Sequence, residues 1–437
     1  MNGLLTDLYE LTMAAGYFEA GKVDEKATFE AAIRRLPPHR NFVLAAGLPQ
    51  IVDYLLNLSF AAEEIDYLRS LAQFRNASPA FWDYLGRFRF TGDLFAVPEG
   101  TPLFAGEPLL TIRGPIIEAQ IPETYLLSAI TFQTLIASKA VRSVEASGGR
   151  PVVEFGTRRA HTPEAGVLGA RASYLGGCAG TSNTLAGFRY GIPVVGTSAH
   201  SWVMSFPCEM EAFRRLQRVL GDSTVQLLDT YDSLEGARHA AKLGKPLGGV
   251  RIDSGDFLSL SRQIRTILDE AGLPEAKIMA SGDLDEYRIR DLVNDGAPID
   301  TFGLGTQLST SADAPHMSAT YKLVELDISG IKRFTAKYSQ DKISVPGSKQ
   351  VFRDVARDVI ARSGECGKGE ALLKPVILGG RLIEPLPTIE QAREHAARSV
   401  AKLAPALRQL EVGEPWPVIY SRELRELVDR TRHNLAG

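Results

Sequence analysis

The sequence predicts an α/β protein in which alternating strands and helices form a barrel in the middle of the chain. Short apolar segments recur between residues 152 and 304, and most are followed by a helical pattern. Strand-helix alternation of this kind is typical of parallel sheets, and apolar strands indicate that both faces of the sheet are covered. Six or more such units favour a barrel, closed or incomplete, over an open sheet. The predicted strands are Val152–Phe155, Pro193–Val195, Val225–Leu228, Gly249–Ile252, Lys277–Ala280 and Thr301–Leu304.

The helix after the fourth of these strands has the clearest periodicity. Its apolar residues recur at intervals of three and four and define one buried face. They are Phe257, Leu260, Ile264, Ile267 and Leu268. The strands themselves end in Gly, Ser, Thr, Asp or Arg, as in FGTRR, GTSAH, RIDSGD and GLGT. Because the carboxyl ends of βα strands carry the active face, these polar loops are expected to line one pocket.

The segments before and after the predicted barrel lack its regular strand-helix alternation and predict an α+β domain. Before the barrel we expect a helix capped by Thr6 or Asp7, then further elements read from apolar periodicity and from Pro and Gly turns. They are a strand at Ala27–Ile33, a helix at Phe42–Leu58, short β-runs over 93–114 and a long helix at Glu118–Ser147. After it we expect strands at Tyr321–Leu326 and Ile331–Tyr338, a hairpin at Val376–Leu382 and a helix at Thr388–Ala404.

These elements predict a division of the chain into three parts. An N-terminal α+β domain over residues 1–140 is completed by residues from about 319 to 385. The βα-barrel catalytic domain covers 141–318, and a C-terminal helical segment covers 386–437.

The composition excludes several classes of protein. With 49 Lys and Arg against 52 Asp and Glu, the net charge of -3 gives no reason to expect nucleic acid or a membrane surface as a partner. The spacing of Cys178, Cys208 and Cys366 fits neither a disulfide framework nor a zinc site. The sequence shows no secretory signal and no apolar run of about 20 residues, so a cytoplasmic location is expected.

The segment Gly196-Thr-Ser-Ala-His200 places a histidine at the junction of a strand and a loop. An imidazole there can act as a general base or as a nucleophile toward phosphorus. The alternative is a structural histidine with its hydrogen bonds satisfied, and the spacing alone favours neither interpretation.

The segment Arg251-Ile-Asp253-Ser-Gly255-Asp256 gathers a cation and two carboxylates around one turn. Arginine suits two-pronged contact with phosphate, and aspartate suits ribose hydroxyls or a magnesium ion that holds pyrophosphate. The alternative is an Arg–Asp pair with a helix cap, which the spacing supports equally well.

Glycines follow the last two strands. Ser281-Gly282-Asp283 and Gly303-Leu-Gly305-Thr306 resemble phosphate cradles, because glycine lets backbone N–H groups approach an anion. Each signal is weak alone, but phosphate sites are frequent late in barrels. Phe155 and Arg158 end the first barrel strand and could hold a flat anionic ring, although a core Phe with a surface Arg is the simpler interpretation.

The ordered set of motifs is more specific than any one of them. TDLYELTMAAGY, EFGTRRAH, SYLGGCAGTSNTLAGFRYGIPVVGTSAHSWVMSF, GVRIDSGD, DTFGLGT, YKLV and VPGSK together resemble the nicotinate phosphoribosyltransferase family over residues 5 to 390. The resemblance implies the irregular (β/α) barrel of the type II phosphoribosyltransferases, with an α+β domain built from N-terminal and post-barrel segments. It also implies a homodimer whose active sites lie at the subunit interface.

The resemblance implies a reaction and a set of site residues. Nicotinate and phosphoribosyl pyrophosphate give nicotinate mononucleotide and pyrophosphate, with coupled ATP hydrolysis and a need for Mg²⁺. His200 matches the catalytic histidine that ATP phosphorylates. Tyr9, from the partner subunit, and Phe155 would stack on the ring, while Arg158 and Thr197 would hold the ring and its carboxylate. The residues expected to hold ribose and phosphate are Arg251, Asp253, Gly282, Asp283, Gly303, Gly305 and Thr306, with Ser344, Ser348 and Lys349 in a further phosphate loop.

Substrate choice is predicted from the stretch Ala179-Gly-Thr-Ser182-Asn183, which contains no acid. In related nicotinamide enzymes an acidic residue accepts from the amide here, whereas hydroxyl and amide groups can donate to a carboxylate. Nicotinate is therefore the expected substrate. Nicotinamide as the substrate, or a non-catalytic barrel that binds phosphate, remain the alternatives; quinolinate enzymes are shorter chains.

Overall fold

The computed structural model describes residues 3–339 and 342–436 and divides the chain into two compact units. Unit 1 comprises Met1–Leu135, His316–Lys402 and Val412–Gly437, and unit 2 comprises Ile136–Pro315 with Leu403–Glu411. The long helix α6 (Glu123–Ala146) begins in unit 1 and ends in unit 2. Each unit is described by itself below.

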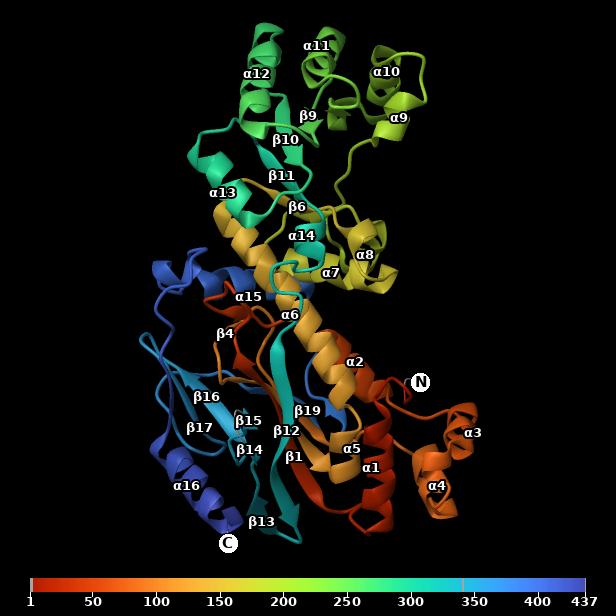
Figure 1. Ribbon diagram of the computed structural model, residues 1–437, viewed down its shortest axis with the longest axis vertical. Coiled ribbons are helices and arrows are strands. Elements are labelled where there is room, and N and C mark those ends of the chain that lie inside the picture. Colours follow the sequence, from red (N-terminus) through yellow and green to blue (C-terminus); the bar gives the residue numbers. More distant parts are fainter. Residues whose placement is uncertain (1–2, 340–341, 437) are drawn as a thin grey trace. The chain divides into compact units, whose positions relative to one another are not determined.

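Unit 2 is built on a six-stranded parallel sheet with the order β7-β6-β11-β10-β9-β8 (Figure 1). The end strands β7 and β8 are not paired with each other among the described residues, so the ring of strands is incomplete. The strands are β6 (Val152–Glu154), β7 (Gly180–Thr181), β8 (Val225–Leu227), β9 (Gly249–Ile252), β10 (Lys277–Ser281) and β11 (Thr301–Leu304).

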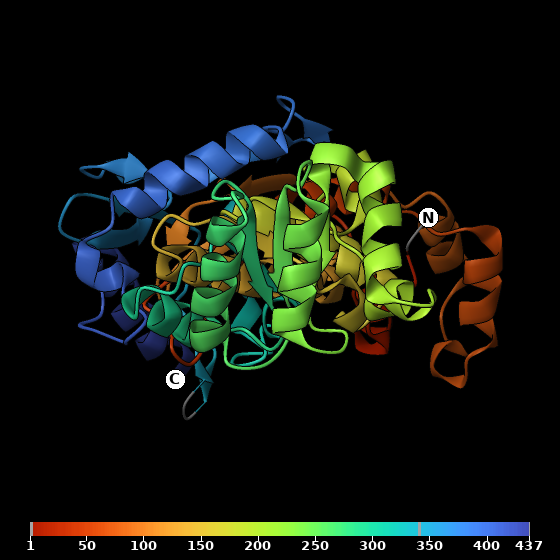
Figure 2. The same ribbon diagram turned by 90° about the horizontal axis from the view of Figure 1, so that it is seen from above.

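Helices follow the strands and cover the sheet. They are α7 (Pro163–Leu175), α8 (Thr184–Tyr190), α9 (His200–Met204), α10 (Glu209–Leu220), α11 (Ser233–Leu243), α12 (Phe257–Glu270), α13 (Glu286–Asn294) and α14 (Thr306–Ser309). Helices α10, α11 and α12 pack side by side, as both Figure 1 and Figure 2 show. The apolar face predicted for α12 is confirmed, because Phe257, Ile264 and Leu268 are buried in the core beneath it.

Five of the six predicted barrel strands are confirmed, and the strand predicted at Pro193–Val195 is wrong. Val194 makes a single parallel bridge to Thr181, and the sheet takes β7 as its edge instead. Proline lacks a backbone N–H, so Pro193 cannot donate to a ladder. The apolar run at 192–195 therefore lies beside the sheet edge without becoming a named strand.

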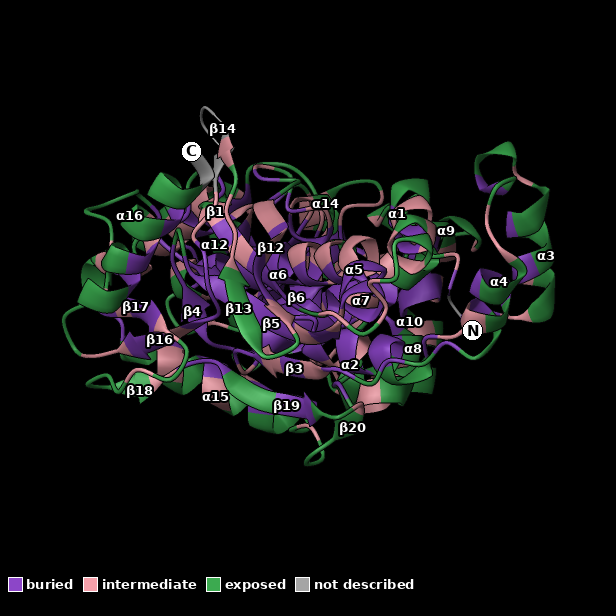
Figure 3. Ribbon diagram, turned by 90° about the horizontal axis from the view of Figure 1, so that it is seen from below, coloured by how far each residue is buried: buried purple, intermediate pink, exposed green. Residues whose placement is uncertain are grey.

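Unit 1 contains a seven-stranded antiparallel sheet with the order β13-β12-β1-β5-β3-β19-β20. Its strands are β1 (Lys26–Arg35), β3 (Asp93–Ala96), β5 (Pro108–Pro115), β12 (Ser318–Ile328), β13 (Ile331–Phe334), β19 (Lys374–Leu378) and β20 (Arg381–Leu382). The strands before and after unit 2 are interleaved, since β1 pairs with β12 on one side and with β5 on the other. Figure 3 shows that β5 is largely buried.

A smaller four-stranded sheet in unit 1 has the order β18-β16-β17-β21. Its strands are β16 (Lys349–Arg353), β17 (Asp358–Arg362), β18 (Glu370–Ala371) and β21 (Val418–Tyr420). Two short pairs are β2 (Val43–Leu44) with β4 (Pro102–Leu103), and β14 (Tyr338–Ser339) with β15 (Lys342–Ile343). The helices are α1 (Leu8–Glu19), α2 (Leu48–Asn57), α3 (Ala62–Ser70), α4 (Pro79–Gly86), α5 (Ile116–Gln120), α15 (Ile389–Ala401) and α16 (Arg422–Ala436).

Four predicted elements of unit 1 need correction. The strand predicted at Ile331–Tyr338 ends at Phe334, and Tyr338 belongs to the separate strand β14. The helix predicted at Phe42–Leu58 begins only at Leu48, because Val43–Leu44 pairs as a strand and Gly47 turns the chain at a φ of 109°. The helix predicted at Glu118–Ser147 is interrupted at Pro122, where proline cannot supply an N–H to a preceding turn. Residues 386–437, predicted as helical, contain β21 in addition to α15 and α16.

No helix in the part of the chain that the structure describes has both the length and the apolar character that a bilayer crossing requires.

Candidate functional site

A polar cluster lies at the carboxyl ends of the unit 2 strands, and the guanidinium of Arg251, on β9, is at its centre. It donates from Nε to Ser281 Oγ (2.7 Å), from Nη1 to Thr197 Oγ1 (2.7 Å) and from Nη2 to Asp253 Oδ1 (2.5 Å). Ser281 Oγ donates in turn to the same Asp253 oxygen at 2.6 Å. The ends of β9 and β10 and the 196–199 loop are thereby tied together, as the polar strand ends predicted.

The carboxylate of Asp253 is held in its ionised form. Partial burial acts to raise its pKa, but the hydrogen bonds from Ser281 and Arg251 and the charge of Arg251 outweigh burial, so the pKa lies below its ordinary value. The second oxygen, Oδ2, faces the imidazole Nε2 of His200 at 3.9 Å. Asp253 therefore offers a negative charge to the candidate catalytic histidine.

His200 is the first residue of α9, and its side chain is 41% exposed. Its Nδ1 lies 3.2 Å from Thr230 Oγ1. When Nδ1–H donates to that hydroxyl, Nε2 carries the free lone pair and points toward Asp253. The geometry is therefore that of an oriented and accessible imidazole.

Asp229 belongs to the same cluster and was missed as a site residue. Its Oδ2 accepts the backbone N–H of Asp253 (3.2 Å) and the hydroxyl of Ser254 (2.6 Å). Its Oδ1 is buried and has no hydrogen-bond partner among the described residues. Asp229 and Thr230 come one residue after the end of β8, so their place near a strand end was the signal that could have found them.

The glycines predicted as cradles allow close packing at the site. Gly282 has a φ of 96°, and a Cβ there would overlap the carbonyl oxygen of Asp253. A Cβ at Gly303 would come within 2.7 Å of the Phe155 ring. Asp283 also has a positive φ, of 48°, and is exposed beside Gly282. Gly305 and the exposed Thr306 begin the short helix α14.

Phe155 is 9% exposed and follows β6, with the Arg251 guanidinium 5.9 Å from its ring centre. Phe155, predicted to stack on the substrate ring, therefore lies next to Arg251, predicted to bind phosphate. Arg158 lies in the following short turn, Thr157–Arg159, and is exposed.

Glu154, the last residue of β6, is a buried carboxylate beneath these loops. It accepts the backbone N–H of Gly156 and the hydroxyl of Thr181, the latter at 2.5 Å. Burial raises the pKa of Glu154, although the two hydrogen bonds oppose the shift. Asn183 extends this set of hydrogen bonds. Its backbone N–H donates to Thr181 Oγ1 (2.9 Å), and its Nδ2 donates to Thr157 Oγ1 (3.1 Å). These bonds join the two loops predicted to hold the ring and its carboxylate.

The remaining predicted site residues belong to unit 1; they are Tyr9, Ser344, Ser348 and Lys349. Tyr9 is 47% exposed at the start of α1. The Lys349 ammonium is buried; it donates to the carbonyl oxygens of Val345 and Gly347, both at 2.8 Å, and pairs with Glu30 at 3.1 Å. Its three N–H groups thus have protein partners in this conformation.

The other two residues of that loop are held by their neighbours. Ser344 Oγ accepts the backbone N–H of Lys337 at 2.8 Å, and the backbone carbonyl of Ser348, which is buried, accepts the N–H of Ser363 at 2.7 Å. Across the described ranges, no group of three or more His, Cys, Asp or Glu side chains is arranged to hold a metal ion.

Family models match almost the whole chain. The nicotinate phosphoribosyltransferase N-terminal domain matches residues 4–131, the nicotinate phosphoribosyltransferase family matches 151–362, and the C-terminal domain of the same enzymes matches 340–428. The chain belongs to the nicotinate phosphoribosyltransferase family. The resemblance inferred from its ordered motifs is therefore confirmed.

Similar members of the nicotinate phosphoribosyltransferase family include nicotinate phosphoribosyltransferase pncB2 of Mycobacterium tuberculosis, 45% identical over 99% of this chain and 94% of the relative. The Bacillus subtilis relative is 42% identical over 80% of this chain and 72% of its own. Among solved structures, human nicotinic acid phosphoribosyltransferase has a TM-score of 0.85 and 29% identity, covering 97% of this chain and 99% of that one. The predicted fold class is confirmed by this likeness and by the parallel sheet.

Proposed function

We propose that this protein is a nicotinate phosphoribosyltransferase of the salvage route of NAD biosynthesis, acting in the cytoplasm. It would form nicotinate mononucleotide and pyrophosphate from nicotinate and phosphoribosyl pyrophosphate. The observation that carries the proposal is the Arg251–Asp253–Ser281 cluster beside His200, set at the carboxyl ends of parallel strands. The names of its relatives favour nicotinate over the alternatives of nicotinamide or a non-catalytic role.

The residues of unit 2 supply binding and orientation for this reaction. In the transfer, the pyridine nitrogen forms a bond to the anomeric carbon of ribose as the bond from that carbon to pyrophosphate breaks. Arg251 supplies positive charge for the departing pyrophosphate, and Gly282 and Gly303, which carry no Cβ, would let backbone N–H groups approach phosphate or ribose oxygens. Phe155 presents a ring face on which the pyridine would stack, with Arg158 and Thr197 near its carboxylate.

The coupling to ATP is assigned to His200. With Nδ1 held by Thr230, the lone pair of Nε2 would attack the γ-phosphorus of ATP, and the bond from that phosphorus to ADP would break. The exposure of the imidazole and the contact that orients it through Nδ1 support this role.

Magnesium would be held by carboxylates of the same cluster together with pyrophosphate oxygens. Mg²⁺ in phosphate-transfer sites commonly takes one or two protein carboxylates and keeps its other positions for substrate and water. Asp253 and Asp229 fit that requirement, since the buried Oδ1 of Asp229 has no hydrogen-bond partner among the described residues. The bound cation would neutralise charge on the pyrophosphate.

The active assembly is proposed to be a homodimer with shared sites, in which Tyr9 of one subunit covers the ring bound by the other. The exposure of Tyr9 in unit 1 is consistent with this role. Tyr9→Ala and His200→Ala should each lack ATP-coupled synthesis, and mixing the two variants should restore part of it through mixed dimers. An absence of rescue, when subunit exchange is demonstrated, would mean that each site is complete within one chain.

The decisive experiment is product analysis by mass spectrometry. The purified protein is incubated with phosphoribosyl pyrophosphate, Mg²⁺ and either nicotinate or nicotinamide, with and without ATP. The expected outcome is nicotinate mononucleotide, formed faster with ATP, and an acid-labile phosphoryl group on the protein. Comparable rates with nicotinamide would overturn the substrate assignment.

A further inference from the structure

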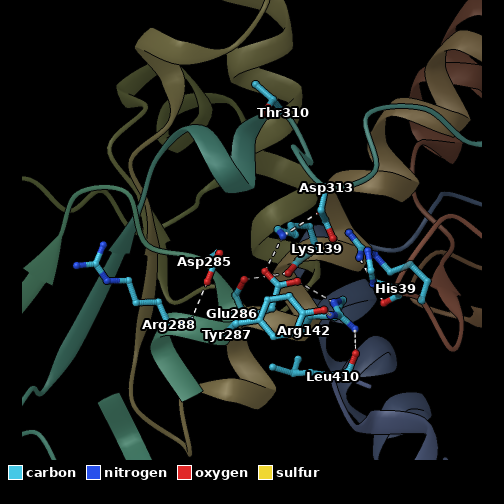
Figure 4. A network of polar contacts seen from close by, with 12 residues as sticks. His39, Lys139, Arg142, Asp285, Glu286, Tyr287, Arg288, Thr310, Asp313 and Leu410 are labelled. Carbon is cyan, nitrogen blue, oxygen red and sulfur yellow. Dashed lines mark hydrogen bonds and ion pairs between the residues drawn. The ribbon is translucent and has the colours of Figure 1, made fainter. Parts of the chain in front are cut away.

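A buried cluster of ionic side chains lies within unit 2, apart from the candidate site. The Lys139 ammonium pairs with Glu286 Oε2 at 2.5 Å and with Asp313 Oδ1 at 2.9 Å. Arg142, one turn further along α6, pairs from Nε with Glu286 Oε1 at 2.9 Å. Figure 4 shows the Glu286 carboxylate between the two cations. Two cations and two carboxylates are therefore joined in one network.

The centre of the network is removed from solvent, while Asp313 at its edge is 19% exposed. The side chain of Lys139 is 1% exposed and that of Glu286 is 0% exposed. Burial acts to raise the pKa of Glu286, but Lys139 and Arg142 outweigh it, so the pKa lies below its ordinary value and the carboxylate is ionised. Buried pairs of this kind add little net stability compared with apolar packing, and their best-documented use is to specify one geometry.

The two carboxylates come from chain segments that lead away from the candidate site. Glu286 is the first residue of α13 and lies three residues after Asp283, at the end of the loop that follows β10. Asp313 follows α14, the short helix that begins after Gly305. Lys139 thus connects the segment behind one glycine-containing loop with the segment behind the other.

Both glycine-containing loops pack closely against residues of the site. The backbone of Gly282 lies against the carbonyl of Asp253, and Ser281 bonds to Asp253 and Arg251. Gly303 lies against the ring of Phe155. A shift of either loop would therefore be transmitted to groups proposed to bind phosphate.

We propose that Lys139 is a positioning residue that fixes the 281–285 and 303–306 loops relative to each other for binding of phosphoribosyl pyrophosphate. This inference rests on the proposed function for the identity of the ligand. Arg142 supports it by holding the other oxygen of Glu286, by donating from Nη2 to the Tyr287 hydroxyl (3.0 Å) and by donating from Nη1 to the Leu410 carbonyl (3.1 Å). The ammonium itself touches no substrate.

The test uses the full-length protein and two variants. Lys139→Met keeps the length of the side chain and removes the charge. Asp313→Asn removes one of the two ion pairs and keeps Lys139 on Glu286, which makes it the milder change if Lys139→Met fails to fold. Arg290→Met is the matched control, because Arg290 also lies on α13 but pairs at the surface with Asp291 and Glu411.

Kinetics and calorimetry give the readout. Because small displacements of positioning groups can cost up to about a hundredfold, we expect Lys139→Met to raise KM for phosphoribosyl pyrophosphate about tenfold. The Kd for inorganic pyrophosphate, measured by titration calorimetry, should rise in parallel, while KM for nicotinate stays within about twofold. Asp313→Asn should show about a threefold effect, Asp313→Glu should recover most of it, and Arg290→Met should show none.

Other outcomes would overturn the inference. A lower Tm with unchanged KM for phosphoribosyl pyrophosphate and unchanged pyrophosphate affinity would show that Lys139 acts on stability alone. An equal rise in KM for both substrates would exclude a specific action on these loops, and so would a wild-type protein that does not bind pyrophosphate. Failure of the wild type to make nicotinate mononucleotide would sink the proposed function, but the pyrophosphate titration would still decide the role of Lys139.

Discussion

Three carboxylates removed from solvent, two in unit 2 and one in unit 1, differ in the direction of their pKa shifts. In unit 2, Asp253 and Glu286 are partly or fully buried, yet each faces an arginine or a lysine and has a lowered pKa. In unit 1, Glu10 on α1 is buried close to Glu123, and burial raises its pKa to about 7. The Glu10 side chain accepts from Gln120 at 2.5 Å, but this hydrogen bond does not offset the cost of burial.

The difference shows what pairing achieves in a protein interior. Where cations and hydrogen-bond donors outweigh burial, as at Asp253 and Glu286, the carboxylate remains ionised and the pair defines a fixed geometry, which suits a surface that must receive phosphate. Where the neighbours are an amide and another acid, as at Glu10, ionisation of the carboxylate lowers the free energy of unfolding, and this loss depends on pH.

His200→Ala should abolish ATP-coupled turnover, because no other imidazole occupies this place in the cluster. Slow ATP-independent synthesis should survive, since phosphorylation serves coupling and not the glycosyl transfer. The measurement is ADP release in parallel with product formation. His239→Gln is the control in the same unit, since His239 pairs with Glu209 instead of the cluster. ATP hydrolysis that still keeps pace with synthesis in His200→Ala would refute the assignment.

Arg251→Met should lower kcat/KM for phosphoribosyl pyrophosphate by about a hundredfold or more. Removing one member of a buried, hydrogen-bonded charge pair typically costs about 2–5 kcal/mol, and here Asp253 would also lose its cation. Lys277→Met is the control, because that lysine forms an exposed pair with Asp300 at the far end of β10, and surface pairs contribute about 0–1 kcal/mol. Equal effects from both substitutions would show that the cluster is not the site.

Ser182→Asp should lower kcat/KM for nicotinate by about a hundredfold before it affects phosphoribosyl pyrophosphate. Position 182 lies beside Glu154, whose backbone carbonyl accepts the Ser182 N–H at 2.9 Å. The new carboxylate would repel the carboxylate of nicotinate, and this repulsion is strong at low dielectric. Ser182→Asn has nearly the same shape without the charge and should retain most activity. Initial rates with each pyridine measure the effect, and a loss shared by Asn would indicate a steric cause.

Glu10→Gln should stabilise unit 1, and the gain should depend on pH. Because the folded-state pKa is raised, ionisation opposes folding from about pH 4.5 upward, and the penalty reaches its full size above about pH 7. The variant should therefore gain up to about 2 kcal/mol over wild type at pH 8 and almost nothing at pH 4, as measured by urea unfolding. Glu63→Gln, exposed on α3, should show no such pH dependence. An equal gain at both pH values would contradict the ionisation argument.

Much of the fold could be predicted from local patterns. Apolar runs that end in polar residues located five of the six predicted barrel strands, and a period of 3.6 located the buried face of α12. The failures occur where one residue overrides the pattern. Gly47 delays a helix and Pro122 divides another, because positive φ and a missing N–H are local facts that apolar periodicity does not record. Pro193 has the same effect on a predicted strand.

The candidate site follows a similar division. The place of Arg251, Asp253 and His200 at strand ends was predictable, because parallel strands bring their carboxyl ends to one face. The bonding partners of Ser281 and Asp229 were not predictable, because the sequence does not show which neighbour a hydroxyl or a carboxylate will bond.

The sequence by itself determined the family, the order of the barrel elements and the chemical type of each residue in the cluster, since these depend on local composition and on motifs in a fixed order. Only the tertiary structure decided which charges are paired. Lys139 and Glu286 are 147 residues apart, and nothing in either segment predicts that they meet. Pairing depends on burial and distance, which arise when the chain is folded, and these decide whether a carboxylate in this protein is ionised.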